Sequence, residues 1–516
     1  MNHAPASAAL VAEGLAAQRA GNFVKAMECY RQVLTEKPDD TDALHLLGGL
    51  ALAQGKFPLA EKLIGLAHQL NPTSAAISGN LALVYRATGR YDDAYHLLHA
   101  GLSYAPHDER LNTLVGNVLC DLRRYDEAIE KFLCVTRQHP QAVEAWQGLA
   151  HAAYRVANIP AAQQAIQAAL ALSPQAPHLL NGQAQIEQSC GHEETAEKIW
   201  RALVANNAEP QMRINLGLLL MRQGQWAEGF HLFSARVDLA AVFPHMPVWH
   251  GEPVGEKSLL VHGEQGLGDT LQFLRFLPAL LGRAKRVCVT VPPSLLKLAT
   301  RTVPGVEFFP LSPTPPVADV QTSLMSLPHH LGLAGPEALK NFPPLLRADD
   351  AQTRAWAEKL GNFPRPWVGL VWAGNPHHLH DQLRSIPQHL FLTCLPQHFS
   401  GTFFSLQVGR ADDGALAQHT PRVVTLAHAL TDYDATAALA THLDLMIAVD
   451  TSVAHAAASL HRPTWLLLHH DPHWCWHGRG AESAWYPSLT LFRQTAPQHW
   501  PPVLDNIRHA LNNFSS

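Results

Sequence analysis

The sequence has little charge and no long apolar run. Asp, Glu, Lys and Arg make up 16% of its 516 residues, and the formal net charge is −5. So weak a field gives no indication of nucleic acid or an anionic membrane as a partner. No stretch approaches 18 uninterrupted apolar residues, so we expect no membrane span. A chain of this length should divide into two to four compact units.

Paired cysteines and an export signal are also missing. The seven cysteines are scattered, and none belongs to a C-x-x-C pair. This pattern suits buried thiols in a reducing cytosol better than a disulfide framework. The first residues, MNHAPASAALVAEG, have neither a basic segment nor a continuous apolar segment. We therefore predict a soluble, cytoplasmic protein whose first residues form the first helix of the fold.

What the first half does contain is an internal repeat of 34 residues. Proline recurs at this spacing from Pro38 to Pro174, and alanine recurs from Ala26 to Ala196. Glycine keeps the same spacing at Gly21, Gly55 and Gly89. Each unit indicates a helix, a tight turn, a second helix and a proline that ends it. One such hairpin cannot bury its apolar face alone, so the units should stack into a superhelix with a concave groove.

The pattern resembles the tetratricopeptide repeat, with about six to seven repeats over residues 7–236. Such arrays are usually binding surfaces for peptides or proteins, although one can also serve as a spacer or a dimerisation arm. Some protein glycosyltransferases line the groove with a row of asparagines. The equivalent row here holds asparagine only at Asn80 and Asn215. We therefore expect an acceptor peptide to be held in a different way.

From about residue 250 the pattern changes to short apolar runs that alternate with helical segments. The predicted strands cover residues 258–263, 286–291, 367–372, 402–406, 443–449 and 464–468. This alternation predicts parallel sheets built from βαβ units. We expect two Rossmann-like α/β lobes, residues 250–345 and 365–516, with a cleft between them. In such sheets a ligand lies beyond the carboxyl ends of the strands.

The first motif, GEQGLGDT at residues 263–270, lies between a predicted strand and a predicted helix. Gly266 and Gly268 let the backbone approach a ligand, and a helix N-terminus presents free N–H groups to an anion. The second strand ends in Thr290 and Val291 with no acidic residue, which argues against an NAD enzyme. Two roles fit Asp269. It can cap the helix, or it can face the cleft and take a proton from an acceptor.

The second motif, DTSVAHAAA at residues 450–458, follows the predicted strand 443–449. Thr451 and Ser452 would place two hydroxyls at a helix start, where free N–H groups favour a pyrophosphate. His455 could hydrogen-bond the same phosphates or could simply be packed. Asp450 could bind a ribose hydroxyl or cap the helix.

The third motif follows the predicted strand 367–372. Gly374 and Asn375 form a loop of small residues, and Arg384 precedes a predicted helix. Arginine suits a bidentate phosphate contact. An ordinary surface position explains Arg384 equally well on spacing alone.

Together these motifs resemble glycosyltransferase family 9, the lipopolysaccharide heptosyltransferases. Residues 450–458 are similar to the family's D-T-G-x-x-H-x-A-A signature, GLGD to its first loop, and Arg384-Ser385-Ile386-Pro387 to its basic-x-W-P segment. The resemblance covers most of residues 255–515. It implies a GT-B fold and inverting transfer from a nucleotide sugar, without a metal or another cofactor.

The resemblance also assigns roles. It implies that Asp269 is the catalytic base. It implies that Arg384, Thr451, Ser452 and His455 bind the donor, mainly within the C-terminal lobe. Ser452 stands where the family has glycine and Ile386 stands where it has tryptophan, so the donor need not be an ADP-heptose.

The repeat array is absent from heptosyltransferases. It is similar instead to the arrays of protein O-linked N-acetylglucosamine transferases and of bacterial transferases that modify flagellin or other surface proteins. We therefore expect a bacterial glycosyltransferase whose protein acceptor docks on the repeats. Two alternatives stay open: a non-catalytic adaptor with a degenerate transferase domain, and an enzyme whose acceptor is a small molecule or a lipid-linked glycan.

A histidine-rich loop at residues 469–477 invites a metal interpretation. Its spacings fit no standard zinc pattern, and the chain has 32 histidines spread along its length. We therefore predict no metal site. Trp474 and Trp476 in this loop either stack on a base or sugar in the cleft or pack in the core.

Overall fold

The computed structural model describes residues 4–206, 209–264, 266–312, 314–378, 381–409, 416, 423–476, 478 and 480–514. The chain divides into two compact units, Met1–Ile199 and Trp200–Ser516. Within the described ranges, no helix combines the length and the apolar character that crossing a bilayer requires.

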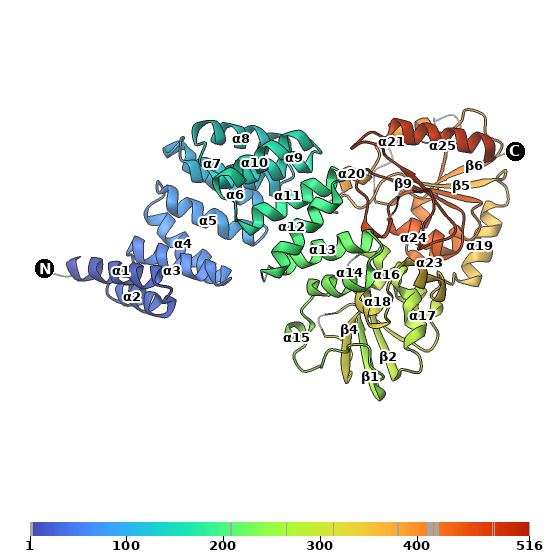
Figure 1. The fold of residues 1–516 in the computed structure, drawn as a ribbon, viewed down its shortest axis with the longest axis horizontal. Coiled ribbons are helices and arrows are strands. Elements are labelled where there is room, and N and C mark those ends of the chain that lie inside the picture. The colour runs from blue at the N-terminus through green and yellow to red at the C-terminus, as the bar shows by residue number, and fades with distance from the viewer. Residues whose placement is uncertain are drawn as a thin grey trace. The chain divides into compact units, whose positions relative to one another are not determined.

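The first unit is a series of antiparallel helix pairs (Figure 1). Its helices are α1 (Ala4–Arg19), α2 (Phe23–Glu36), α3 (Thr41–Ala53), α4 (Phe57–Leu70), α5 (Ala75–Ala87), α6 (Tyr91–Tyr104), α7 (Glu109–Asp121), α8 (Tyr125–Gln138), α9 (Val143–Arg155), α10 (Ile159–Leu172), α11 (Pro177–Ser189) and the start of α12 (Glu193–Ala205). The N-caps of α3, α5 and α7 are Asp40, Ser74 and Asp108, which keep the 34-residue spacing.

Small residues allow the two helices of a pair to approach each other. A Cβ atom added to Gly48 would lie 2.5 Å from Cγ1 of Ile64, and one added to Gly116 would lie 2.5 Å from Cε1 of Phe132. Larger residues at these positions would push the helices apart. The repeated small residues therefore encode the helix crossings, as the spacing predicts.

The turn within each pair needs a left-handed residue. Gly21, Gly55 and Gly89 supply it with φ of +78°, +70° and +75°. The equivalent positions in the next two repeats are Arg123 and Ala157, with φ of 61° and 60°. A side chain with a Cβ atom is strained in this conformation.

We expect Ala157→Gly to stabilise the first unit by about 0.5–1 kcal/mol, because it relieves this strain at a small cost in chain entropy. Urea unfolding followed by circular dichroism would measure the change. Gly55→Ala is the matched opposite substitution and should destabilise by a similar amount. Equal stability of Ala157→Gly and the wild type would contradict the expectation.

The second unit contains two parallel sheets (Figure 1). The first has the strand order β3-β2-β1-β4 and the second β10-β9-β8-β5-β6-β7, and every neighbouring pair is parallel. The strands are β1 (Gly255–His262), β2 (Ala284–Val291), β3 (Glu307–Pro310), β4 (Val320–Ser323), β5 (Trp367–Val371), β6 (Thr402–Ser405), β7 (Val423–Thr425), β8 (Leu445–Val449), β9 (Thr464–Leu468) and β10 (Leu489–Arg493). The parallel sheets predicted from the alternating pattern are confirmed.

Helices and short turns cover these sheets and connect their strands. The α-helices are α13 (Pro210–Arg222), α14 (Trp226–Phe233), α15 (Leu239–Val242), α16 (Leu267–Phe273), α17 (Leu296–Thr302), α18 (Leu327–His330), α19 (Asp350–Leu360), α20 (Asp381–Arg384), α21 (Gln388–Phe391), α23 (Tyr433–Ala440), α24 (Ser452–Ser459) and α25 (Pro501–Phe514). The 3₁₀ turns are η1 (Ser234–Arg236), η2 (Leu274–Leu280), η3 (Pro293–Leu295), η4 (Leu324–Ser326), η5 (Pro336–Asn341), η6 (Leu392–Cys394), η7 (Ala427–Ala429) and η8 (Trp474–Trp476).

Each sheet has one point at which the order of its strands reverses. From β1 the chain adds β2 and β3 on one side and then returns to place β4 on the other side of β1. From β5 it adds β6 and β7 and then returns to place β8 beside β5. In open α/β sheets ligands bind at these switch points, beyond the carboxyl ends of the strands. The loops after β1, β5 and β8 lie at these two points.

The last helix pair, α13 and α14, is built into the second unit by aromatic packing. Trp226 of α14 stacks on Trp485 with a centroid distance of 5.3 Å, and Phe230 meets the edge of Trp474 at 5.5 Å. Trp226 is fully buried and Phe230 is 1% exposed. Burial of this size makes the pair part of the core around the sheets.

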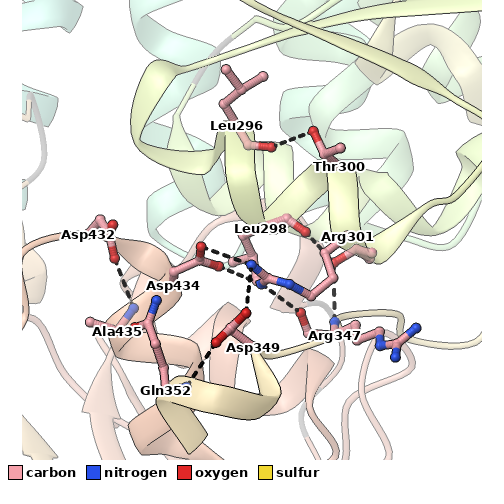
Figure 2. Close-up of polar contacts among 11 residues, drawn as sticks. Leu296, Leu298, Thr300, Arg301, Arg347, Asp349, Gln352, Asp432, Asp434 and Ala435 are labelled. Carbon is pink, nitrogen blue, oxygen red and sulfur yellow. Dashed lines mark hydrogen bonds and ion pairs between the residues drawn. The ribbon is translucent and has the colours of Figure 1, made fainter.

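A partly buried ion pair joins the two lobes (Figure 2). Arg301 of α17, beside the first sheet, donates to both carboxylate oxygens of Asp434 of α23, beside the second, at 2.7 and 3.1 Å. Arg301 also lies 3.5 Å from Asp349, the N-cap of α19 in the connecting segment. A bidentate pair with a nearly buried carboxylate fixes geometry, because its partners cannot separate without leaving a charge unpaired.

Candidate functional site

The loop after β1 lies directly against the helix after β8. A Cβ atom placed on Gly268 would stand 3.0 Å from Cδ2 of His455 and 3.6 Å from Cα of Ser452. A side chain at residue 268 would therefore crowd the His455 ring. The structure thus brings the first and second sequence motifs together, at the carboxyl ends of strands from different sheets.

Asp269 lies in the first turn of α16 and is half-buried. Its Oδ2 accepts a hydrogen bond of 2.9 Å from the N–H of Gly266, the N-cap of the helix. No hydrogen bond to its Oδ1 is found among the described residues. The carboxylate also lines a pocket of about 360 Å³. Asp269 therefore holds the helix start with one oxygen and can offer the other to a ligand.

This pocket is walled by the last helical repeat and by both lobes. It is lined by Gln211, Ile214, Leu218, Phe233, Arg236, Asp269, Met325 and His473. The first three belong to α13, and His473 belongs to the loop after β9. The wall is therefore partly apolar and also carries a carboxylate, a guanidinium, an amide and an imidazole.

Thr451 is the N-cap residue of α24, and among the described residues no side chain caps this helix. Thr451 is 9% exposed, and within the part of the chain that the structure describes its Oγ1 has no hydrogen-bond partner. Ser452, the next residue, hydrogen-bonds the hydroxyl of Tyr433. An unpartnered buried hydroxyl beside the free N–H groups of a helix start is an arrangement that suits a phosphate.

His455 is packed beneath this site. It is 6% exposed, its Nδ1 hydrogen-bonds the Tyr486 hydroxyl at 3.0 Å, and its ring lies 5.1 Å from that of Trp476. Its Nε2 lies 3.9 Å from Oδ1 of Asp450. Burial lowers the pKa of His455 by more than the negative charges of Asp450 and Asp269 raise it. The ring is therefore neutral near pH 7, fixed by Tyr486, with Nε2 toward Asp450.

Arg384 connects the loops after β5 and β8. Its Nη1 donates to the backbone oxygen of Asp450 at 3.0 Å, and its Nε lies 3.6 Å from Oδ1 of Asp381. A Cβ atom on Gly374 would lie 2.6 Å from Nη2 of Arg384. Glycine at 374 therefore makes room for the guanidinium, which lies at the switch point of the second sheet.

Asn375 differs from its neighbours. It is exposed, and its Oδ1 accepts from the N–H of His377 at 3.0 Å. This contact lies within its own loop.

Two residues that the sequence analysis gave no role hold the first loop in place. Arg236, at the end of the last repeat, donates to Glu264 of the GEQGLGD loop with its Nε at 3.0 Å. Glu264 in turn accepts from the N–H of Met325 at 3.2 Å. These contacts link segments 28 and 61 residues apart. Glu264 belongs to the quoted motif, but no local pattern points to Arg236.

The histidine-rich loop packs tightly. Trp474 and Trp476 are 4% and 1% exposed, and both contact aromatic rings of the core. Within the described ranges, no three His, Cys, Asp or Glu side chains gather as metal ligands do. His477 lies outside the described residues. The absence of a metal stays a prediction.

Comparisons with known proteins identify the helical region. Two family models described as tetratricopeptide repeat match, one over residues 52–118 and the other over residues 11–75 and 115–177. The N-terminal unit is a tetratricopeptide-repeat array. Arrays of this kind imply protein or peptide partners.

One curated relative aligns along nearly the whole chain. It is Protein FlbA of Caulobacter vibrioides, 26% identical over 537 residues, with 97% of this chain and 83% of FlbA covered. Among solved structures, a tetratricopeptide repeat protein of Parabacteroides merdae has 18% identity and a TM-score of 0.39, covering 46% of this chain and 95% of its own. Pseudomonas aeruginosa pilF has 20% identity and a TM-score of 0.35, covering 39% and 90%.

Proposed function

We propose that this chain is an inverting glycosyltransferase of GT-B type that moves a sugar from a nucleotide-sugar donor to a protein acceptor. The proposal rests on the contact between the switch point of the first sheet and that of the second. One contributes the carboxylate of Asp269, and the other contributes the open start of α24 beside Arg384. A general base opposite an anion site is what transfer from a nucleotide requires.

The donor would lie on the second sheet. Its phosphate would accept hydrogen bonds from the first N–H groups of α24, from the Thr451 hydroxyl and from Arg384. Gly374, Asn375, Asp450, Ser452 and His455 would shape or border this site, and Gly266 and Gly268 would close it from the first lobe. Nucleotide sugars are substrates here, and the proposal needs no other cofactor.

The reaction would need only these groups. Asp269 would take the proton of an acceptor hydroxyl or amide as the acceptor atom bonds to the anomeric carbon. The bond from that carbon to the phosphate oxygen would break, and the nucleotide would leave with the electron pair. The start of α24, Thr451 and Arg384 would stabilise the negative charge that develops on the phosphate.

A protein acceptor is favoured by the pocket at Asp269. Three of its lining residues, Gln211, Ile214 and Leu218, come from α13 of the last repeat. Gln211 is held by Asn215, whose Oδ1 accepts from it at 2.9 Å. A peptide side chain bound in this pocket would contact both the last repeat and Asp269.

A non-catalytic adaptor is the alternative. It is favoured by the packing of His455 between Tyr486 and Trp476, which leaves less of the ring for a ligand. Either function fits a cytoplasmic protein, since all seven cysteines are free thiols. An adaptor would bind a nucleotide without transferring or hydrolysing its sugar.

A thermal-shift screen with nucleoside mono- and diphosphates and nucleotide sugars tests the donor site. We expect one nucleotide to raise the melting temperature of the wild type. A nucleotide concentration of 100 times Kd should stabilise the folded protein by about 2.7 kcal/mol. The shift should be largely lost in Thr451→Val, which keeps the shape of the side chain and removes its hydroxyl. Thr73→Val, on an exposed turn of the first unit, is the matched control. No shift at millimolar nucleotide would refute the proposal.

A further inference from the structure

Three consecutive residues at the start of α23 make three separate contacts. The side chain of Asp432 accepts from the N–H of Ala435 at 2.9 Å and caps the helix. The hydroxyl of Tyr433 hydrogen-bonds Oγ of Ser452. Asp434, with its side chain 2% exposed, forms the ion pair with Arg301. This turn therefore touches the first lobe on one side and the start of α24 on the other.

The ion pair fixes the turn relative to the first lobe (Figure 2). Arg301 extends from α17 toward Asp434 and Asp349, which come from two other segments. The backbone N–H of Arg347 donates to Oγ1 of Thr302 at 3.2 Å, so the connecting segment is tied to the same helix. A buried carboxylate with a bidentate partner resists movement, since separation would strand its charge.

The hydroxyls of Tyr433 and Ser452 share a hydrogen bond. Among the described residues, the neighbouring Thr451 hydroxyl has no hydrogen-bond partner and no side chain caps α24. A serine hydroxyl left free at a helix start often turns to its own backbone. The bond to Tyr433 competes with such a contact and so favours open N–H groups in the first turn.

We propose that Tyr433 is a positioning residue for the donor phosphate. By holding Ser452, it sets the first turn of α24 so that the Thr451 hydroxyl and the free N–H groups face the ligand. The Arg301–Asp434 pair fixes the position of the neighbouring Tyr433 and so links the first lobe to the donor site. This inference rests on the proposed function only in taking the ligand to be a nucleotide phosphate. It gives Ser452, which stands where the resembled family has glycine, a role that needs no contact with the donor.

Isothermal titration of the full-length protein tests the inference, with inorganic pyrophosphate and the nucleotide that gives the largest thermal shift as probes. Tyr433→Phe and Ser452→Ala should each weaken the Kd by about tenfold, the usual effect of one hydrogen bond. The double variant should be no weaker than either single variant, because both remove the same contact. Melting temperatures without ligand should stay close to that of the wild type.

The lobe contact is tested in the same way. Arg301→Ala should weaken the Kd, and Arg301→Lys should restore part of the loss. Tyr104→Phe, at an exposed tyrosine of the first unit, should change nothing. Wild-type affinity in Tyr433→Phe, or losses that add in the double variant, would overturn the inference while leaving the proposed function intact. A wild type that binds neither probe would overturn both.

Discussion

Replacement of Asp269 with asparagine is expected to lower the rate of sugar transfer by a factor of about 10²–10⁴. Asparagine keeps an oxygen that can accept from the N–H of Gly266, so the start of α16 should stay intact. It cannot take a proton from the acceptor. Nucleotide affinity should therefore change little while turnover is lost, and nucleotide release in the presence of acceptor would measure it.

Asp269→Ala separates the two roles of this residue. It removes both the base and the hydrogen bond to Gly266, so it should also lower the melting temperature, by an amount equivalent to about 1 kcal/mol. Asp505→Asn, at a carboxylate whose side chain is 58% exposed on α25, is the matched control and should keep full activity. Full turnover in Asp269→Asn would show that Asp269 serves only as a cap.

The second large effect concerns where the chain can be shortened. A chain that begins at Glu193, the first residue of α12, should fold, because it keeps the whole of the second unit. A chain that begins at residue 236 should not fold. It lacks Trp226 and Phe230, which pack against Trp474 and Trp485.

The size of the loss supports this expectation. Removing one large buried aromatic side chain typically costs about 3–5 kcal/mol, and a whole domain is stable by only about 5–15 kcal/mol. Size-exclusion chromatography and thermal unfolding of the two shortened chains would compare them. Equal melting temperatures would show that the contacts of Trp226 and Phe230 are not needed for folding.

The chain that begins at Glu193 also tests the acceptor. Donor binding should persist in it while transfer to a protein acceptor falls, whereas a small-molecule acceptor would still be modified.

The repeats could be predicted because single residues at a fixed spacing determine where their helices cross and end. Ala26, Gly48 and their equivalents mark helix crossings, and each proline ends a unit. Continuous apolar runs likewise predicted strands such as β8 and β9. The strand β4 was missed because its buried residues after Val320 are polar. Gln321, for example, donates to the carbonyl oxygens of Leu239 and Met246. Edge strands β3, β7 and β10 were also missed.

The site was less predictable than the fold. Glycines and hydroxyls at strand ends drew attention to the three loops, and the structure brings these loops together. Their supports could not be predicted, since Tyr433 and Tyr486 meet Ser452 and His455 across 19 and 31 residues without any repeating pattern. Ser452 was expected to bind the donor, and in the structure its hydroxyl is held by Tyr433 instead. Its role toward a donor stays a prediction.

We propose that the chain transfers a sugar from a nucleotide. The most direct measurement is nucleotide release by the full-length protein from a panel of nucleotide sugars, with extract from cells that lack this protein as the source of acceptor. We predict release from one donor well above background, and a rate lower by about 10²–10⁴ with Asp269→Asn. Binding of a nucleotide without release from any donor would contradict the account and identify the chain as an adaptor.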